Sequence, residues 1–258
     1  MSKKRNAGDE RELLRQAVVE FIGPFALVFI GVGAIISTAG ENLIAIALAH
    51  GLAIGLLVAS AGHISGGVYN PALTIGLLVT GRLPVNRAGV YVVAQLAGAT
   101  VAALALKAVF FGSDIDAVNL GVPAIAPGFS VGAGILAEAI GTFFLMFAVF
   151  GTAVDKRGAK EIAPLVIGLI ITIDILAFGA VTGGAVNPSR SFGPALVQGD
   201  WTNFWVYWVG PVAGAVGAAL LYHHLLQPGT ITPEAGRVEI EPTTAQRETP
   251  RSERRRRR

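Results

Sequence analysis

Two short motifs in matching surroundings constrain the fold of this chain more than any other feature. Asn70-Pro71-Ala72 lies in the segment GHISGGVYNPALTIG, and Asn187-Pro188-Ser189 lies in GAVTGGAVNPSRSFG. In each motif a glycine-rich loop precedes Asn, which is favoured at a helix N-cap, and Pro, which is favoured at the first helical position. Only about ten residues of helix follow, too few to cross a bilayer. Two half-helices in corresponding places of a repeated membrane protein indicate a transport site.

Apolar stretches of membrane-spanning length accompany these motifs. Hydrophobic residues make up 53% of the 258 residues and charged residues only 14%, which is too apolar for a soluble domain. The sequence therefore predicts an all-α membrane protein with six transmembrane helices and two re-entrant half-helices. The six spans are expected at roughly residues 16–38, 42–61, 88–107, 132–153, 162–179 and 203–225.

The distribution of Lys and Arg predicts the orientation. These residues gather near the N-terminus, after the first half-helix, after the fourth span and in the C-terminal tail. The connections 39–41 and 108–131 contain neither residue. Because cytoplasmic loops carry the excess of Lys and Arg, both termini are predicted to be cytoplasmic. We expect a multi-pass protein of the plasma membrane.

The chain divides into a channel domain and two tails. Residues 1–15 form a charged N-terminal tail, residues 16–226 the channel domain, and residues 227–258 a basic tail that ends in five arginines. The last segment is too polar to bury a core, so it is predicted to be disordered and solvated. The alternative is a contact between its arginines and anionic lipid headgroups.

The channel domain contains an inverted repeat of three spans each. Glu20 and Glu138 are 118 residues apart, and Asn70 and Asn187 are 117 residues apart, so the same elements recur at about 16–110 and 132–226. Three is an odd number, so the second repeat is inverted, and the two half-helix N-termini meet near the bilayer midplane. Their unpaired N–H groups and partial positive charges orient a water oxygen and repel cations and protons.

These residues resemble a known family, the major intrinsic proteins or aquaporins, over about residues 16–225. The resemblance rests on GHISGGVYNPALT, TGGAVNPSRSFGPAL and the repeated Glu20 and Glu138. It implies the aquaporin fold, one pore per subunit and a homotetramer in the lipid bilayer, with no nucleic-acid partner. It also implies that Glu20 and Glu138 support the pore loops, with His63 in the first loop. Ser189 stands where the family has Ala, and a small Ser is expected to fit.

The resemblance also implies a selectivity filter of four residues, located by counting from the two Asn. These are His50, Ile175, Gly184 and Arg190. The set is similar to that of plant tonoplast intrinsic proteins that pass ammonia as well as water, although no histidine is available in the third connection to add a fifth contact. We therefore expect a passive channel for water, with ammonia and other small neutral solutes as further solutes. A glycerol or small-polyol facilitator is the alternative, and the missing aromatic residue argues against it.

Other features bear on competing classes of function. A secondary transporter also uses inverted repeats and broken helices, and Asp174 offers it an intramembrane carboxylate. The same residue could instead line a subunit interface, bond a neighbouring helix or touch the pore. The sequence has no cysteine, so it forms neither disulfides nor thiolate metal sites. We expect no enzyme activity, no catalytic residues, no metal site and no cofactor.

Overall fold

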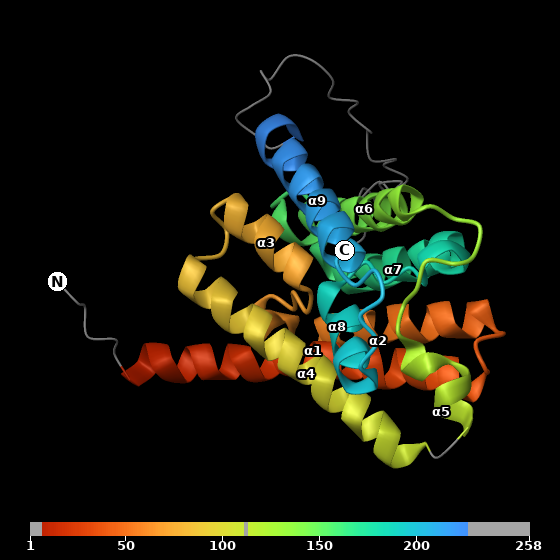
Figure 1. Cartoon of the computed structure of the whole chain (residues 1–258). Helices are drawn as coiled ribbons and strands as arrows, with labels where there is room; N and C mark the ends of the chain where they lie inside the picture. The colour runs from red at the N-terminus through yellow and green to blue at the C-terminus, as the bar shows by residue number, and fades with distance from the viewer. Residues whose placement is uncertain (1–6, 111–112, 227–258) are drawn as a thin grey trace, which may run out of the picture.

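The computed structural model describes residues 7–110 and 113–226, and this part contains six helices long and apolar enough to cross a membrane (Figure 1). The prediction of six spans is thereby confirmed. The basic tail at 227–258 lies outside the described residues. The long helices are α1 (Ala7–Ser37), α2 (Leu43–Ser65), α4 (Val85–Val109), α6 (Val131–Ala148), α7 (Ala163–Thr182) and α9 (Val206–Leu221). Single π-helical segments, η2 (Val149–Val154) and η4 (Tyr222–Leu226), extend α6 and α9.

The two half-helices form where the Asn-Pro motifs predict them. They are α3 (Pro71–Val79) and α8 (Pro188–Gln198). The Asn70 Oδ1 accepts a hydrogen bond from Ala72 N at 2.9 Å, and the Asn187 Oδ1 accepts one from Ser189 N at 3.0 Å. Each Asn thus caps its own helix, and Pro follows it at the first helical position. Shorter helices occupy the connections: α5 (Ser113–Ala117), η1 (Asn119–Gly121) and η3 (Lys160–Ile162).

The packing of the helices follows the repeat. α1 packs on α2 and α4, and the corresponding α6 packs on α7 and α9. The half-helices cross over between the repeats, because α3 packs against α9 and α8 packs against α4 (Figure 1). α2 and α7 pack on each other along the line where the repeats meet. Each half-helix is therefore held by a span of the other repeat.

Glycines at corresponding positions allow these close helix contacts. A Cβ at Gly98 of α4 would collide with the backbone oxygen of Phe21, and a Cβ at Gly214 of α9 would collide with that of Ala139. A Cβ at Gly168 of α7 would lie 2.6 Å from the Gly51 oxygen of α2. Helices in membranes associate through such small residues, because lipid offers no hydrophobic driving force between helices.

The first helix begins earlier than the sequence predicts. α1 starts at Ala7, so residues 7–15, which the sequence analysis assigned to the N-terminal tail, are helical. Helix-forming Glu, Arg and Leu residues fill this turn, and Gln16 Nε2 donates to Glu12 Oε1 at 2.9 Å, one helical turn away. Hydropathy identifies only the lipid-embedded part of the helix, so the predicted start at residue 16 falls later than the observed start at Ala7.

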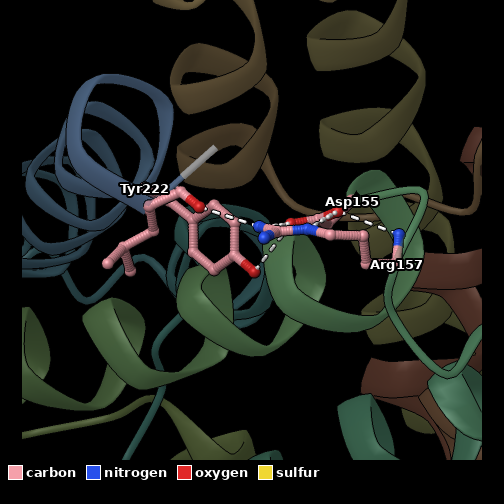
Figure 2. Close-up of polar contacts among 4 residues, drawn as sticks. Asp155, Arg157 and Tyr222 are labelled. Carbon is pink, nitrogen blue, oxygen red and sulfur yellow. Dashed lines mark hydrogen bonds and ion pairs between the residues drawn. The ribbon is translucent and has the colours of Figure 1, made fainter. Parts of the chain in front are cut away.

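A polar cluster fastens the connection after α6 to the end of α9 (Figure 2). Arg157 donates to both oxygens of Asp155, through Nε at 3.1 Å and Nη2 at 2.7 Å. Tyr222 Oη donates to Asp155 Oδ2 at 3.2 Å, and Arg157 Nη2 also donates to the Leu226 carbonyl at 2.8 Å. These hydrogen bonds with the Arg157 guanidinium and backbone lower the pKa of the Asp155 carboxyl to about 2.

The Asp155 cluster leads to a pH-dependent stability prediction. Asp155→Asn removes the negative charge and one of the two acceptor oxygens that bind Arg157, so it should lower the unfolding temperature by a few degrees at pH 7. A lowered pKa means that this stabilisation is complete above the ordinary pKa of 3.8 and disappears as the pH falls toward about 2. Unfolding in detergent, followed by circular dichroism, should show the same difference at pH 7 and pH 5. A difference that vanishes by pH 5 would contradict the prediction.

Candidate functional site

Two buried carboxylates hold the loops that precede the half-helices. Glu20 of α1 accepts hydrogen bonds from Val68 N at 3.0 Å and Tyr69 N at 2.8 Å. Glu138 of α6 accepts bonds from Ala185 N at 2.9 Å and Val186 N at 2.7 Å. Both side chains are fully buried, at 0% and 1% exposure. The geometry agrees with the supporting role expected of Glu20 and Glu138.

The residue before each Asn has a strained backbone. Tyr69 has a φ of +51° and Val186 has a φ of +42°. A side chain in the left-handed region costs about 1–3 kcal/mol, and a β-branched residue such as Val is particularly unfavourable there. A hydrogen bond from the same residue's N–H to a charged carboxylate contributes roughly 1.5–3 kcal/mol. The Glu carboxylates therefore offset the strain that turns each loop into its half-helix.

Hydroxyl groups at matching positions complete the support. Ser65 Oγ donates to Glu20 at 2.6 Å, and Thr182 Oγ1 donates to Glu138 at 2.7 Å. Tyr91 Oη donates to the Ser65 carbonyl at 2.7 Å, and Tyr207 Oη donates to the Thr182 carbonyl at 3.0 Å. The sequence analysis missed the supporting roles of all four residues. Their spacing of 116 or 117 residues, close to that of the Asn pair, was the available signal.

The two Asn side chains link the loops to each other. Asn70 Nδ2 donates to the Val186 carbonyl at 2.8 Å, and Asn187 Nδ2 donates to the Tyr69 carbonyl at 2.9 Å. Each Oδ1 already caps its own half-helix. An amide nitrogen carries two hydrogens, so each Asn keeps one donor for the space between the helix ends. The structure thus brings together the two Asn that the sequence singled out.

Cavities lie on both sides of this junction. One of about 500 Å³ is lined by both Asn and extends past Leu77 to Arg82 and Arg87, the side predicted to be cytoplasmic. Another of about 310 Å³ lies on the opposite side and is lined by Ile175, Arg190 and residues of the connection after α4. A cavity on either side of the paired Asn is what a pore through this junction requires. Among the described residues, no group of three or more His, Asp or Glu could hold a metal ion.

His50 has a defined hydrogen-bonding state. Its Nδ1 lies 2.8 Å from the Ile46 carbonyl, and a carbonyl can only accept. The hydrogen is therefore on Nδ1, which leaves Nε2 as an acceptor in the neutral ring. Nε2 is buried and has no hydrogen-bond partner within the described part of the chain. The edge of the ring that carries Nε2 lies against Gly31 of α1, and His50 lines neither of the two cavities, so its contact with a passing solute stays a prediction.

Arg190 is buried at the start of α8, at 3% exposure. Its Nη1 donates to the Gly121 carbonyl at 2.6 Å, so the connection after α4 reaches Arg190 through its backbone. Arg190 and His50 lie within electrostatic reach of each other. The sequence analysis missed Gly121, because a backbone acceptor leaves no side-chain signal.

Ile175 and Gly184, the other two positions predicted for the filter, are closely packed together. A Cβ on Gly184 would lie 3.1 Å from Ile175 Cα and 3.3 Å from its Cγ1, and Gly184 has a φ of +59°. Glycine is therefore the residue that fits here without strain. Ile175 is buried at 2% exposure and lines the outer cavity.

Two further predicted residues differ in their surroundings. Ser189 is completely buried and fits, and its Oγ donates to Asn187 Oδ1 at 2.7 Å. His63 lies exposed near the end of α2, and in the described structure no hydrogen bond joins it to the first pore loop. Its supporting role stays a prediction.

Comparisons with known proteins agree with this architecture. Residues 8–222 match the family described as Major intrinsic protein. Aquaporin TIP4-4 of Zea mays is 43% identical over 224 residues, which cover 82% of this chain and 86% of the relative. Aquaporin TIP2-1 of Arabidopsis thaliana is 44% identical over 222 residues, which cover 81% of this chain and 86% of the relative.

A solved structure is also similar. The aquaglyceroporin from Plasmodium falciparum superposes with a TM-score of 0.76 at 28% sequence identity, covering 84% of this chain and 98% of that one. The chain belongs to the major intrinsic protein family. It is a multi-pass integral membrane protein of the aquaporin type, and it is not an enzyme.

The hydrogen bond of Asn187 predicts the effect of a substitution there on proton flux. Asn187→Asp replaces a donor with a carboxylate, which cannot donate to the Tyr69 carbonyl and attracts cations instead of repelling them. Losing a hydrogen bond between neutral groups, worth about 0.5–1.5 kcal/mol, should raise proton flux by up to about tenfold. Proteoliposomes that contain a pH-sensitive dye would measure this flux.

A matched control exists on the same molecule. Asn42 caps α2 by accepting from Ala45 N at 3.0 Å, and Asp caps a helix equally well. Asn42→Asp makes the same chemical change outside the pore and should leave proton flux at the wild-type level. Equal proton flux in both variants would contradict the role given to Asn187.

Proposed function

We propose that this chain is a passive channel for water that also conducts ammonia and excludes protons and ions. The observation that carries the proposal is a pair of polar groups within electrostatic reach of each other: His50 Nε2, a buried acceptor without a hydrogen-bond partner in the described residues, and the donors of Arg190. Ammonia has N–H groups to donate and one lone pair to accept, so both partners can bind it. Water satisfies the same two groups.

The four proposed filter residues form a constriction without aromatic side chains. His50, Ile175, Gly184 and Arg190 include no Phe, Tyr or Trp, and Gly184 contributes backbone only. The connection after α4 supplies a backbone contact, the Gly121 carbonyl, in place of a histidine side chain. The TIP-type relatives, at 43% and 44% identity, support the likeness to that branch of the family.

Glycerol is the second candidate solute, and one specific observation favours it. The similar solved structure is named an aquaglyceroporin. The filter argues for water and ammonia instead, because no aromatic ring is present among the four residues to pack against the carbon backbone of glycerol. A secondary transporter is no longer an alternative, since the family assignment defines a channel.

We also propose that the subunits form a homotetramer. Leu52 and Leu56 of α2 and Leu165 and Leu169 of α7 line a shallow apolar hollow of about 230 Å³. Two helices from a neighbouring subunit could cover this face. Chemical cross-linking in proteoliposomes should give a ladder that stops at four subunits, and a product that stays monomeric would exclude the assembly.

The cellular membrane that contains this protein is inferred from its relatives, because the fold does not distinguish one membrane from another. The orientation predicted from Lys and Arg places both termini in the cytoplasm, and we predicted the plasma membrane. The TIP-type relatives carry the name of tonoplast intrinsic proteins, which favours an internal membrane instead. The location of a fluorescent fusion in the native cell distinguishes the two membranes.

The solute proposal is tested at Ile175. Ile175→Phe places a ring beside Gly184, where the space is already tight, and so narrows the constriction. We expect ammonia permeability to fall severalfold more than water permeability, measured by pH change and by stopped-flow swelling of proteoliposomes. Glycerol uptake in the wild-type protein should remain at the level of empty liposomes.

Leu176 provides the control for this experiment. It is the next residue of α7 and is 42% exposed on the outer face of the helix. Leu176→Phe adds the same ring away from the constriction and should leave both permeabilities unchanged. If Ile175→Phe reduces water and ammonia equally, or if glycerol enters readily, the filter proposed here is wrong.

A further inference from the structure

Asp174 is a buried acid that the pore described above does not use. It lies on α7 next to Ile175 and is 2% exposed. Its Oδ2 is buried and has no hydrogen-bond partner in the described part of the chain. A carboxylate without donors is unfavourable in a membrane interior, so this side chain needs an explanation.

The position of Asp174 follows from a difference between the two repeats. In the first repeat the Tyr69 ring packs against Gly23, and its hydroxyl donates to the Leu57 carbonyl at 3.2 Å. At the corresponding place in the second repeat, Val186 is much smaller than Tyr. The Asp174 carboxyl shares the space with it: a Cβ on Gly141 would lie 2.8 Å from Val186 Cγ1 and 3.3 Å from Asp174 Cγ.

The loop support also differs between the repeats. Glu20 has a fourth donor, because Gln95 Nε2 donates to its Oε2 at 2.8 Å. Gln95 lies one helical turn beyond Tyr91, and the residue one turn beyond the matching Tyr207 is Pro211, which has no donor. Glu138 therefore keeps three donors, and the second repeat places another carboxyl, Asp174, within electrostatic reach of it.

We propose that Asp174 is a positioning residue for the second pore loop and that it acts as a neutral acid, with the single negative charge of this pair held by Glu138. The hydrogen bonds decide which carboxyl carries the charge. Glu138 accepts from Thr182, Ala185 and Val186, whereas Asp174 accepts from no described group. Two unscreened negative charges in one buried layer would repel each other.

Charged and titratable groups on three other helices, α2, α8 and α9, lie near the pair of Glu138 and Asp174 or near its neighbour Arg190. Arg190 of α8 and Tyr207 of α9 lie within electrostatic reach of Glu138, and Arg190 also lies within reach of His50 on α2. Arg190 is itself held at the Gly121 carbonyl. A second negative charge on Asp174 would repel the Glu138 carboxylate and so disturb the loop that Glu138 holds.

An infrared measurement tests the protonation state directly. Wild-type protein in proteoliposomes at neutral pH should show the C=O stretch of a protonated carboxyl, and Asp174→Asn should remove it. Asp155→Asn is the matched control, because Asp155 is paired with Arg157 as an anion, and this variant should keep the band. An unchanged band in Asp174→Asn, or no such band in the wild-type protein, overturns the proposal.

Water permeability tests the positioning role. Asp174→Ala empties the space beside Gly141 and should lower water permeability severalfold, whereas Asp174→Asn, neutral and of nearly the same shape, should restore it. Raising the pH until the carboxyl band disappears should lower permeability in the wild-type protein and not in Asp174→Asn. Failure of Asp174→Asn to conduct water while it remains folded by circular dichroism would show that the charge is needed, and would overturn the proposal.

Discussion

The pore depends on one interaction made twice, the hydrogen bonds from a strained loop to a buried carboxylate. Tyr69 and Val186 adopt left-handed backbone conformations that side chains rarely accept, and their N–H groups bond to Glu20 and Glu138. Without these acceptors the chain would relax, and the half-helices would no longer point their N-termini at each other. The two carboxylates are buried and bonded to the loops, so the positions of Asn70 and Asn187 depend on them.

The two repeats share a scaffold and differ at the positions proposed for the selectivity filter. Helix contacts at Gly98 and Gly214, the two Asn caps and the hydroxyl donors recur at nearly constant spacing. His50 and Arg190 have no such counterparts. A symmetrical scaffold can create a barrier to protons, because two equivalent helix ends supply it. Discrimination between neutral solutes requires the unlike residues at one end of the pore.

The sequence predicts the six spans and the two half-helices because both are local: apolar length defines a span, and Asn-Pro defines a helix start. It also pairs Glu20 with Glu138 through the repeat. The contact from Gly121 to Arg190 is beyond such reasoning, since a backbone carbonyl in an irregular connection carries no pattern. The cluster of Asp155, Arg157 and Tyr222 is equally hidden, because it joins segments far apart in sequence. The early start of α1 escapes hydropathy because its first turns lie outside the apolar stretch.

The reciprocal bonds between the two Asn side chains and the opposite loops have a consequence for biosynthesis. Asn70 donates to the Val186 carbonyl, which is synthesised more than a hundred residues later. During translation the first half-helix is therefore made before its partner loop and before α9, the span against which it packs. The first three spans can insert in order, but the junction between the two Asn forms only after the second loop and α9 have been synthesised. Since neither repeat contains a complete pore, the nascent chain offers solutes and ions no path through the membrane before this junction forms.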